Sequence, residues 1–113
     1  MERTHLHILG GTIRSRAEQA RIAFALGHHA EVYGGLEEFL ERPPVEGVIL
    51  AAQDTVTGGT AGLIRRLGEA GVWLPLVVTV EDYTIDQVVD AIGDGAIDCL
   101  SLPLEVNMLA RRL

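Results

Sequence analysis

Four histidines and one cysteine are the side chains in this chain best suited to bind a metal or to act in catalysis. His5 and His7 share one face of an expected strand, and His28 and His29 open the next, so the four could lie close together. A transition-metal site needs nitrogen, sulfur or carboxylate ligands that converge on one point. No cysteine or acidic residue evidently completes such a set. We therefore expect no metal and no cofactor here, and interpret the four as ordinary strand and turn residues.

The other reactive groups stand apart from one another. Asp54 follows an apolar run in an expected loop, where a carboxylate is normally solvated, and Cys99 lies among apolar neighbours as a buried thiol. Ser15 belongs to no G-x-S-x-G nucleophile motif. Residues 10–12 (Gly-Gly-Thr) precede an expected helix and could hold an anion through free backbone N–H groups. They lack a full G-x-G-x-x-G or Walker pattern, so tight-turn geometry explains them.

The composition fits one folded domain that does not grip nucleic acid. The chain has 113 residues, 48% of them hydrophobic, and a net charge of -7. Binding to a phosphate backbone needs clustered Lys and Arg. This chain has nine arginines and no lysine. A basic protein surface is the better expected partner.

Cysteine content and hydropathy predict a cytoplasmic domain. One cysteine allows no intrachain disulfide, which is typical of a reducing compartment. Residues 1–7 are charged and polar and open no signal peptide. No window approaches the roughly 18 apolar residues of a membrane helix, so we expect no membrane partner.

Short apolar runs alternate along the chain with segments of helical period. We expect strands over residues 4–10, 29–34, 47–52, 73–80 and 96–102, and helices over 12–26, 35–42, 60–70, 84–93 and 105–113. The run from Gly47 to Ala52 is apolar on both faces, as in the centre of a parallel sheet covered by helices. The alternation predicts an α/β, (βα)₅ flavodoxin-like fold. This is a three-layer sandwich whose five-stranded parallel sheet has the order 2-1-3-4-5.

Capping residues and apolar stripes make the prediction more specific for two of these helices. Thr12 can cap the first helix, and Gly27 can end it. Its expected apolar stripe is Ile13, Ala17, Ala20 and Phe24. In the helix over 84–93, the apolar residues Ile85, Val88, Val89 and Ile92 recur at i, i+3, i+4 and i+7.

The second half of the chain resembles response-regulator receiver (CheY-like) domains, with the FixJ/LuxR-type subgroup as the closest pattern. The run GDGAIDCLSLP (93–103) is similar to the receiver run of alanine-glycine-alanine, an acid, an aromatic, leucine and lysine-proline. LIRRLGEAG (63–71) and the PLVVTV strand also fit. The resemblance implies one receiver-like domain over residues 1–113 whose last helix is cut short. It also implies that an output domain can follow in a longer parent protein.

Receivers catalyse their own phosphorylation, and the resemblance implies that this chain has lost that chemistry. In the family, an acidic pair holds Mg²⁺, an aspartate is the nucleophile, and a Thr or Ser and a Lys contact the acyl phosphate. Here Gly10 and Gly11 stand at the acidic pair, Ala52 at the nucleophile and Leu102 at the lysine. Cys99 replaces the usual aromatic. Thr79 and Pro103 match.

The expected function is therefore a phosphorylation-independent pseudo-receiver in bacterial signal transduction or transcription regulation. It would be no enzyme, and would act through protein contacts or dimerisation. DNA would be contacted only through a further C-terminal domain. The expected interface, where acids and arginines cross-pair under two-fold symmetry, comprises Asp90, Asp94, Asp98, Met108, Arg111 and Arg112. Two alternatives stay open: a ligand sensor that uses the emptied pocket, and an enzyme that uses Asp54 or the histidines.

Overall fold

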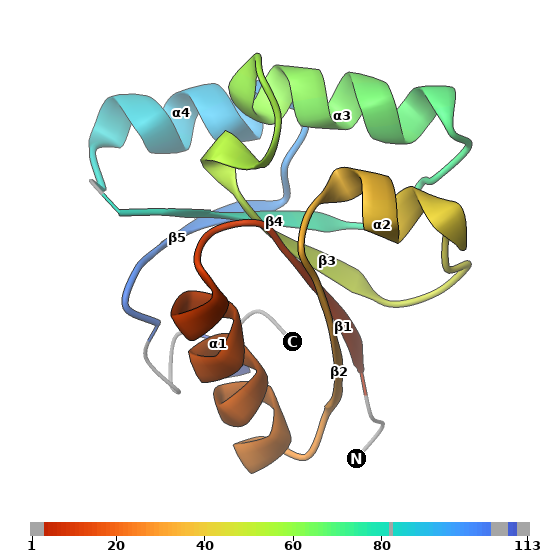
Figure 1. Cartoon of the computed structure of the whole chain (residues 1–113). Helices are drawn as coiled ribbons and strands as arrows, with labels where there is room; N and C mark the ends of the chain where they lie inside the picture. Colours follow the sequence, from red (N-terminus) through yellow and green to blue (C-terminus); the bar gives the residue numbers. More distant parts are fainter. Residues whose placement is uncertain (1–3, 82, 105–108, 111–113) are drawn as a thin grey trace.

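A computed structural model of the chain describes residues 4–81, 83–104 and 109–110. Its centre is a five-stranded parallel sheet with strand order β2-β1-β3-β4-β5 (Figure 1), as predicted. The strands are β1 (His5–Leu9), β2 (His29–Tyr33), β3 (Val48–Ala52), β4 (Leu76–Val80) and β5 (Asp98–Ser101). The helices are α1 (Ile13–Ala25), α2 (Leu36–Glu41), α3 (Gly59–Glu69) and α4 (Ile85–Asp94), with a 3₁₀ turn, η1 (Gln53–Thr55).

Helices cover both faces of the sheet, so the predicted three layers are present. Figure 1 shows α1 on one face and α2, α3 and α4 on the other. Alternate strand residues feed two separate cores. Leu9, Ile49 and Val78 pack on the side of α2, α3 and α4, whereas Leu6, Ile8 and Leu50 pack on the side of α1. Both faces are apolar, as burial on both sides of a parallel sheet requires.

The ends of α1 follow the prediction, but its buried face does not. The Thr12 hydroxyl accepts a hydrogen bond from the Ser15 backbone N–H at 3.0 Å, and Gly27 has a φ of 84° after the last turn. The predicted stripe is wrong in three of its four places, since Ile13, Ala17 and Phe24 are exposed and only Ala20 is buried. Gln19, Ile22 and Ala23 are buried beside Ala20 instead. The helix is therefore rotated relative to the predicted face, and Ile22 with two alanines packs against the sheet.

The apolar residues of α4 also divide between core and solvent. Thr84 and Gln87 form a capping box at its start. Ala91 is buried, and the half-buried Val88 packs against the core. Ile85 and Val89, however, are 80% and 61% exposed. Ile92 is 45% exposed, so three of the four residues of the recurring apolar pattern face outward.

All five strands are shorter than expected, β4 and β5 most of all, and the last helix lies largely outside the described residues. β4 begins at Leu76 rather than residue 73, since Pro75 has no N–H to donate and Trp73 lies exposed against Gly68. β5 begins at Asp98 rather than residue 96. The described Leu104 and Leu109 are buried in the core on the α1 side. Among the described residues, no helix is long and apolar enough to cross a membrane.

Candidate functional site

A hollow of about 540 Å³ opens at the carboxyl ends of the strands, where open α/β sheets usually bind ligands. All five positions that the sequence marked as a degenerate phosphorylation site line it. They are Gly10, Gly11, Ala52, Thr79 and Leu102. Gly34, Thr55, Glu81 and Gln87 complete the wall together with other residues of the same loops. The sequence therefore identified the positions that the fold brings together.

The floor of this hollow is a methyl group beside a hydroxyl group. Ala52 ends β3 and is paired in register with Thr79 on β4. Both are buried. The backbone N–H of Leu102 donates to the Val80 carbonyl at 2.8 Å, which carries Leu102 to the rim. No carboxylate or amine stands at any of these positions, so they cannot form or hold an acyl phosphate.

The loop after β1 disfavours an acidic pair. Gly10 and Gly11 have φ values of 75° and 70°, in the left-handed region that side chains rarely adopt. A Cβ on Gly10 would overlap the Oγ1 atom of Thr55. That hydroxyl donates to the Ala52 carbonyl at 2.6 Å. An acid at either position would therefore strain the backbone, and one at Gly10 would also displace Thr55.

An arginine holds the same loop closed. Nη1 of Arg16, on α1, donates to the carbonyl oxygens of Gly10 and Gly11 at 3.1 and 2.8 Å. A charged donor strengthens these hydrogen bonds. The guanidinium group of Arg16 thus satisfies the carbonyl groups of Gly10 and Gly11.

The electrostatics of the hollow disfavour an anion. Among the described residues that line it, the charged ones are Asp54 and Glu81, and both are acidic and exposed. Asp54 lies on η1, two residues after Ala52. A phosphate would meet two negative charges and no basic side chain, so a neutral or cationic ligand fits this hollow better.

The predicted interface residues fall into two groups. Asp90 and Asp94 are exposed on α4, and Asp98 is half-buried at the start of β5. Met108, Arg111 and Arg112 lie outside the described residues. Around the two exposed acids the structure shows apolar side chains that the sequence analysis did not place in an interface, namely Ile85, Val89 and Ile92.

Two acids of α4 act against the helix dipole. Asp94 is the last residue of α4, where the free carbonyl groups carry partial negative charge, and no basic residue lies in that turn. Asp90 stands one turn before it, which adds like-charge repulsion at i, i+4. This arrangement weakens the isolated helix and suits a surface that meets positive charge.

Cys99 is the buried thiol that the sequence predicted. It lies on β5 inside the core. Burial, with a smaller contribution from the charge of Asp98, raises the pKa of the Cys99 thiol. A thiol held in its protonated form is a poor nucleophile and a poor redox sensor.

Ser15 and the histidines do not form a nucleophile and its base. The Ser15 hydroxyl accepts from Nε2 of Gln19 at 2.9 Å. His28 is buried and accepts the Thr4 N–H through Nδ1 at 2.9 Å. His5 and His7 do converge with an acid, Glu31 of β2. The sequence analysis missed that acid, although the pairing of His7 with Glu31 follows from aligning the first two strands in parallel.

No family model matches this chain, and no curated protein does either. Solved structures do match. Full-length FixJ from B. japonicum superposes with a TM-score of 0.85 at 16% identity over 99% of this chain and 56% of FixJ. The FixJ-N structure gives 0.82 at 22% identity, covering 98% and 90% of the two chains. The beryllofluoride-activated NtrC4 receiver domain dimer gives 0.76 at 19% identity, covering 95% and 90%.

The chain spans little more than half of full-length FixJ but nearly all of FixJ-N. Strand order, helix placement and the position of the hollow agree with this similarity. The protein therefore has the fold of the response-regulator receiver domains.

Proposed function

We propose that this domain is a phosphorylation-independent receiver domain of bacterial signal transduction, which acts in the cytoplasm through protein contacts and not through turnover. One observation carries the proposal. The carboxyl-end hollow has Ala52 where a receiver nucleophile stands, and the loop at Gly10 disfavours the metal-binding acids. At this site the acids that would hold a metal, the nucleophilic aspartate and the lysine that would balance the phosphoryl charge are all replaced.

The replacement residues also support a stable resting state. A cluster of unpaired charges at the sheet end would carry a desolvation cost of several kcal/mol. Here the positions are apolar or glycine, and Arg16 occupies the loop carbonyls. The loop therefore keeps one conformation without a metal or a phosphoryl group.

The contact surface that we propose is the outer face of α4, and the occupant that we propose is a second copy of this chain. Ile85, Val89 and Ile92 form an exposed stripe at i, i+4 and i+7. Asp90 and Asp94 are exposed on the same helix. In a two-fold pair the stripes would pack on each other, and the acids would meet the arginines at 111 and 112 of the other copy. A dimer of the NtrC4 receiver domain has been solved.

In a longer parent protein, this pairing would set the oligomeric state of an output domain that follows residue 113. DNA would then be bound by that output domain. The acidic charge of the present domain fits such a division of roles.

The chemical part of the proposal is tested with a small-molecule phosphodonor. The purified chain is incubated with the donor and Mg²⁺, and its intact mass is measured. We expect no phosphoryl adduct, with a receiver that retains its aspartate as the positive control. An adduct that Asp54→Asn removes would overturn the proposal, because it would show a working acceptor two residues beyond Ala52.

A second candidate function is ligand sensing by the hollow itself. Its volume of about 540 Å³ is in the range of small-molecule pockets. The acids Asp54 and Glu81 at its wall would select a neutral or cationic molecule. A thermal-shift screen of such compounds tests it, with Gly11→Leu as the variant that fills the hollow. A compound that raises the melting temperatures of wild type and of Gly11→Leu equally does not bind in the hollow.

A further inference from the structure

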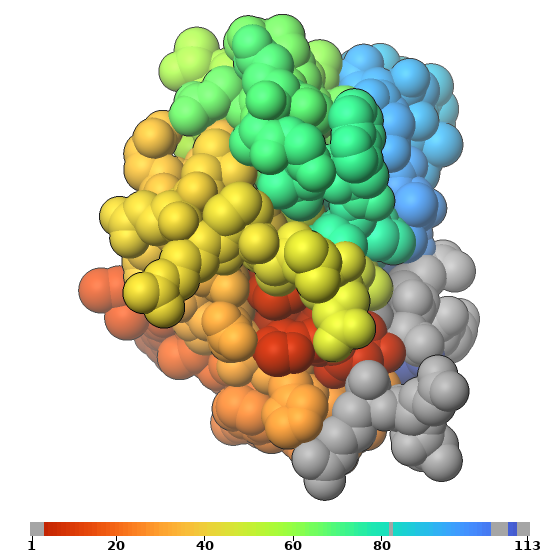
Figure 2. All heavy atoms as spheres, turned by 90° about the vertical axis from the view of Figure 1, so that its right-hand side faces the viewer, coloured from red at the N-terminus to blue at the C-terminus, as the bar shows by residue number. Residues whose placement is uncertain are grey.

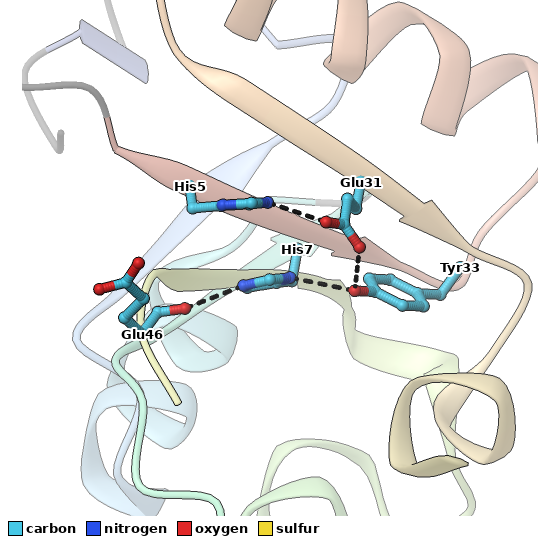
Figure 3. Close-up of polar contacts among 5 residues, drawn as sticks. All are labelled: His5, His7, Glu31, Tyr33 and Glu46. Atoms are coloured by element: carbon cyan, nitrogen blue, oxygen red, sulfur yellow. Dashed lines mark hydrogen bonds and ion pairs between the residues drawn. The ribbon is translucent and has the colours of Figure 1, made fainter. Parts of the chain in front are cut away.

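Two histidines, a glutamate and a tyrosine form a connected polar cluster on β1 and β2. Figure 3 shows His5 and His7 projecting from β1 toward Glu31 and Tyr33 of β2, with Glu46 at the other side of His7. Nε2 of His5 lies 3.0 Å from Oε1 of Glu31. The rings of His5 and His7 are stacked, with centroids 4.9 Å apart. Hydrogen bonds and ring stacking therefore hold these side chains against one another.

Three of these residues can converge on one ion. One ring nitrogen of each histidine and one carboxylate oxygen of Glu31 lie within 4.8 Å of one another. The two histidines are at i and i+2, so they share one face of β1, and Glu31 is paired in register with His7. Two strands of one sheet thus fix all three side chains, which is the rigid support that a metal site needs.

The hydrogen bonds of His7 leave one of its ring nitrogens without a proton, so that nitrogen has a lone pair that can accept. Nε2 lies 3.0 Å from the backbone carbonyl of Glu46, which only accepts, so Nε2 carries the proton. Nδ1 is then an acceptor. This backbone carbonyl is the usual outer partner of a metal-bound histidine, since it fixes both the tautomer and the ring orientation.

Two acceptors compete for a single phenolic proton. Nδ1 of His7 lies 3.2 Å from the Tyr33 hydroxyl, and the same hydroxyl donates to Oε2 of Glu31 at 2.9 Å. A phenol has only one proton to donate. The phenolic proton can serve only one of these acceptors. The other acceptor, either Nδ1 of His7 or Oε2 of Glu31, faces the phenolic oxygen with no proton between them.

A cation resolves this competition. We infer that His5, His7 and Glu31 form a binding site for a divalent transition metal of the Zn²⁺ type, with Nδ1 of His7 as the buried ligand. Two imidazoles and one carboxylate suit Zn²⁺ and its neighbours, whereas Mg²⁺ and Ca²⁺ prefer oxygen ligands. Three protein ligands leave a further coordination position for water or another donor.

The site is open to solvent and separate from the emptied hollow. The side chains of His5 and Glu31 are 35% and 55% exposed, while His7 is buried. Figure 2 looks at the amino-terminal ends of the strands, where red atoms of the first strand reach the surface between the orange and yellow segments. The hollow lies beyond the opposite ends of the strands. Metal binding therefore does not depend on the proposed function.

Zinc titration by calorimetry tests the inference, on untagged protein because a histidine tag would bind the metal itself. We expect one Zn²⁺ per chain and a melting temperature that rises with Zn²⁺ but not with Mg²⁺. Co²⁺ provides the spectroscopic check, since ligation by imidazole nitrogen gives visible absorption bands that differ from those of the aqueous ion. No binding, or Mg²⁺ binding in place of Zn²⁺, would overturn the inference.

Variants at the two exposed ligands locate the bound ion. His5→Gln and Glu31→Gln should each weaken Zn²⁺ binding at least about tenfold, with urea unfolding to show that both variants fold. Glu69→Gln removes the same charge from an exposed position at the end of α3 and should leave the affinity unchanged. Tyr33→Phe removes the competing hydroxyl and should retain binding. If His5→Gln and Glu31→Gln bind Zn²⁺ as wild type does, the site lies elsewhere and the inference is wrong.

Discussion

The guanidinium group of Arg16 donates to the Gly11 carbonyl at 2.8 Å, in the loop where the receiver resemblance places metal-binding acids. A positive charge thus stands beside a loop that the family pattern would make negative. Gly10 and Gly11 take left-handed backbone conformations there, and Thr55 fills the space above Gly10. The proposed loss of phosphorylation chemistry therefore rests on the loop backbone and on Arg16 as well as on the replaced side chains.

Restoring the nucleophile alone should not restore phosphorylation. In Ala52→Asp, a carboxylate would enter a buried position beside Thr79, without acids at Gly10 and Gly11 to hold Mg²⁺ and without a lysine at position 102. We expect no phosphoryl adduct on the intact mass. An incompletely satisfied buried polar group should also lower the free energy of unfolding by about 1–3 kcal/mol.

Ala61→Asp serves as the control for that experiment, because Ala61 is exposed on α3. Its free energy of unfolding should change by less than about 0.5 kcal/mol. Phosphorylation of Ala52→Asp to a level near that of a complete receiver would contradict the account of the loop.

A charge placed in the stripe of α4 should abolish self-association. Val89 is 61% exposed at the centre of this stripe, between Ile85 and Ile92. Val89→Asp would bury a carboxylate in an apolar contact, which we expect to raise the dimer dissociation constant more than tenfold, or about 1.4 kcal/mol. Sedimentation equilibrium of wild type and variant measures this change.

Val45→Asp is the matched control, since Val45 is 94% exposed in the segment between α2 and β3. It should leave the dissociation constant unchanged. If Val89→Asp associates as wild type does, the contact surface is not the α4 face.

Removing the negative charge at the end of α4 should raise the stability of the fold and weaken self-association. Asp94→Asn removes a negative charge from the carboxyl end of a helix, where the dipole disfavours it. We expect the free energy of unfolding to rise by about 0.3–1 kcal/mol in urea at low salt. The same variant should weaken association if Asp94 meets an arginine of the other copy. A more stable variant with unchanged association would remove Asp94 from the interface.

The thiol of Cys99 predicts how stability falls in alkaline solution. Burial, together with the nearby Asp98, raises its pKa in the folded chain. The unfolded thiol has a pKa of about 8.5. The contribution of Cys99 to stability is therefore complete below about pH 8.5 and is lost as pH rises through the folded pKa. Urea unfolding on both sides of about pH 8.5 measures the slope.

Cys99→Ala isolates this contribution, because alanine fits the same space and does not titrate. Its free energy of unfolding should decline less across the same pH interval than that of wild type. An identical decline in both proteins would show that other groups cause the alkaline loss.

The caps of α1 could be predicted because they follow from local chemistry. The sheet order was predicted from the alternation of strands and helices together with the usual winding of open parallel sheets. Periodicity did not show which side of each helix meets the sheet. In α1 the small residues Ala20 and Ala23 pack inward, and Phe24 stays outside. Closeness of packing decided this outcome, and hydropathy alone does not report it.

The meeting of Gly10, Gly11, Ala52, Thr79 and Leu102 in one hollow could also be predicted, since strand ends meet at one edge of a parallel sheet. The overlap between Gly10 and Thr55 could not, because it depends on the path of the turn after β3. Glu31 was missed as a partner of His5 and His7 for a similar reason. A contact between strands depends on the register, which places Glu31 beside His7.

The central claim is tested most directly by light scattering coupled to size exclusion, with and without Mg²⁺ and beryllofluoride, a mimic of the phosphoryl group. Because the site lacks an acceptor at Ala52 and metal-binding acids at Gly10 and Gly11, we expect the same mass and the same melting temperature in both conditions. A change in either quantity that Asp54→Asn abolishes would show a functional acceptor and would contradict the account.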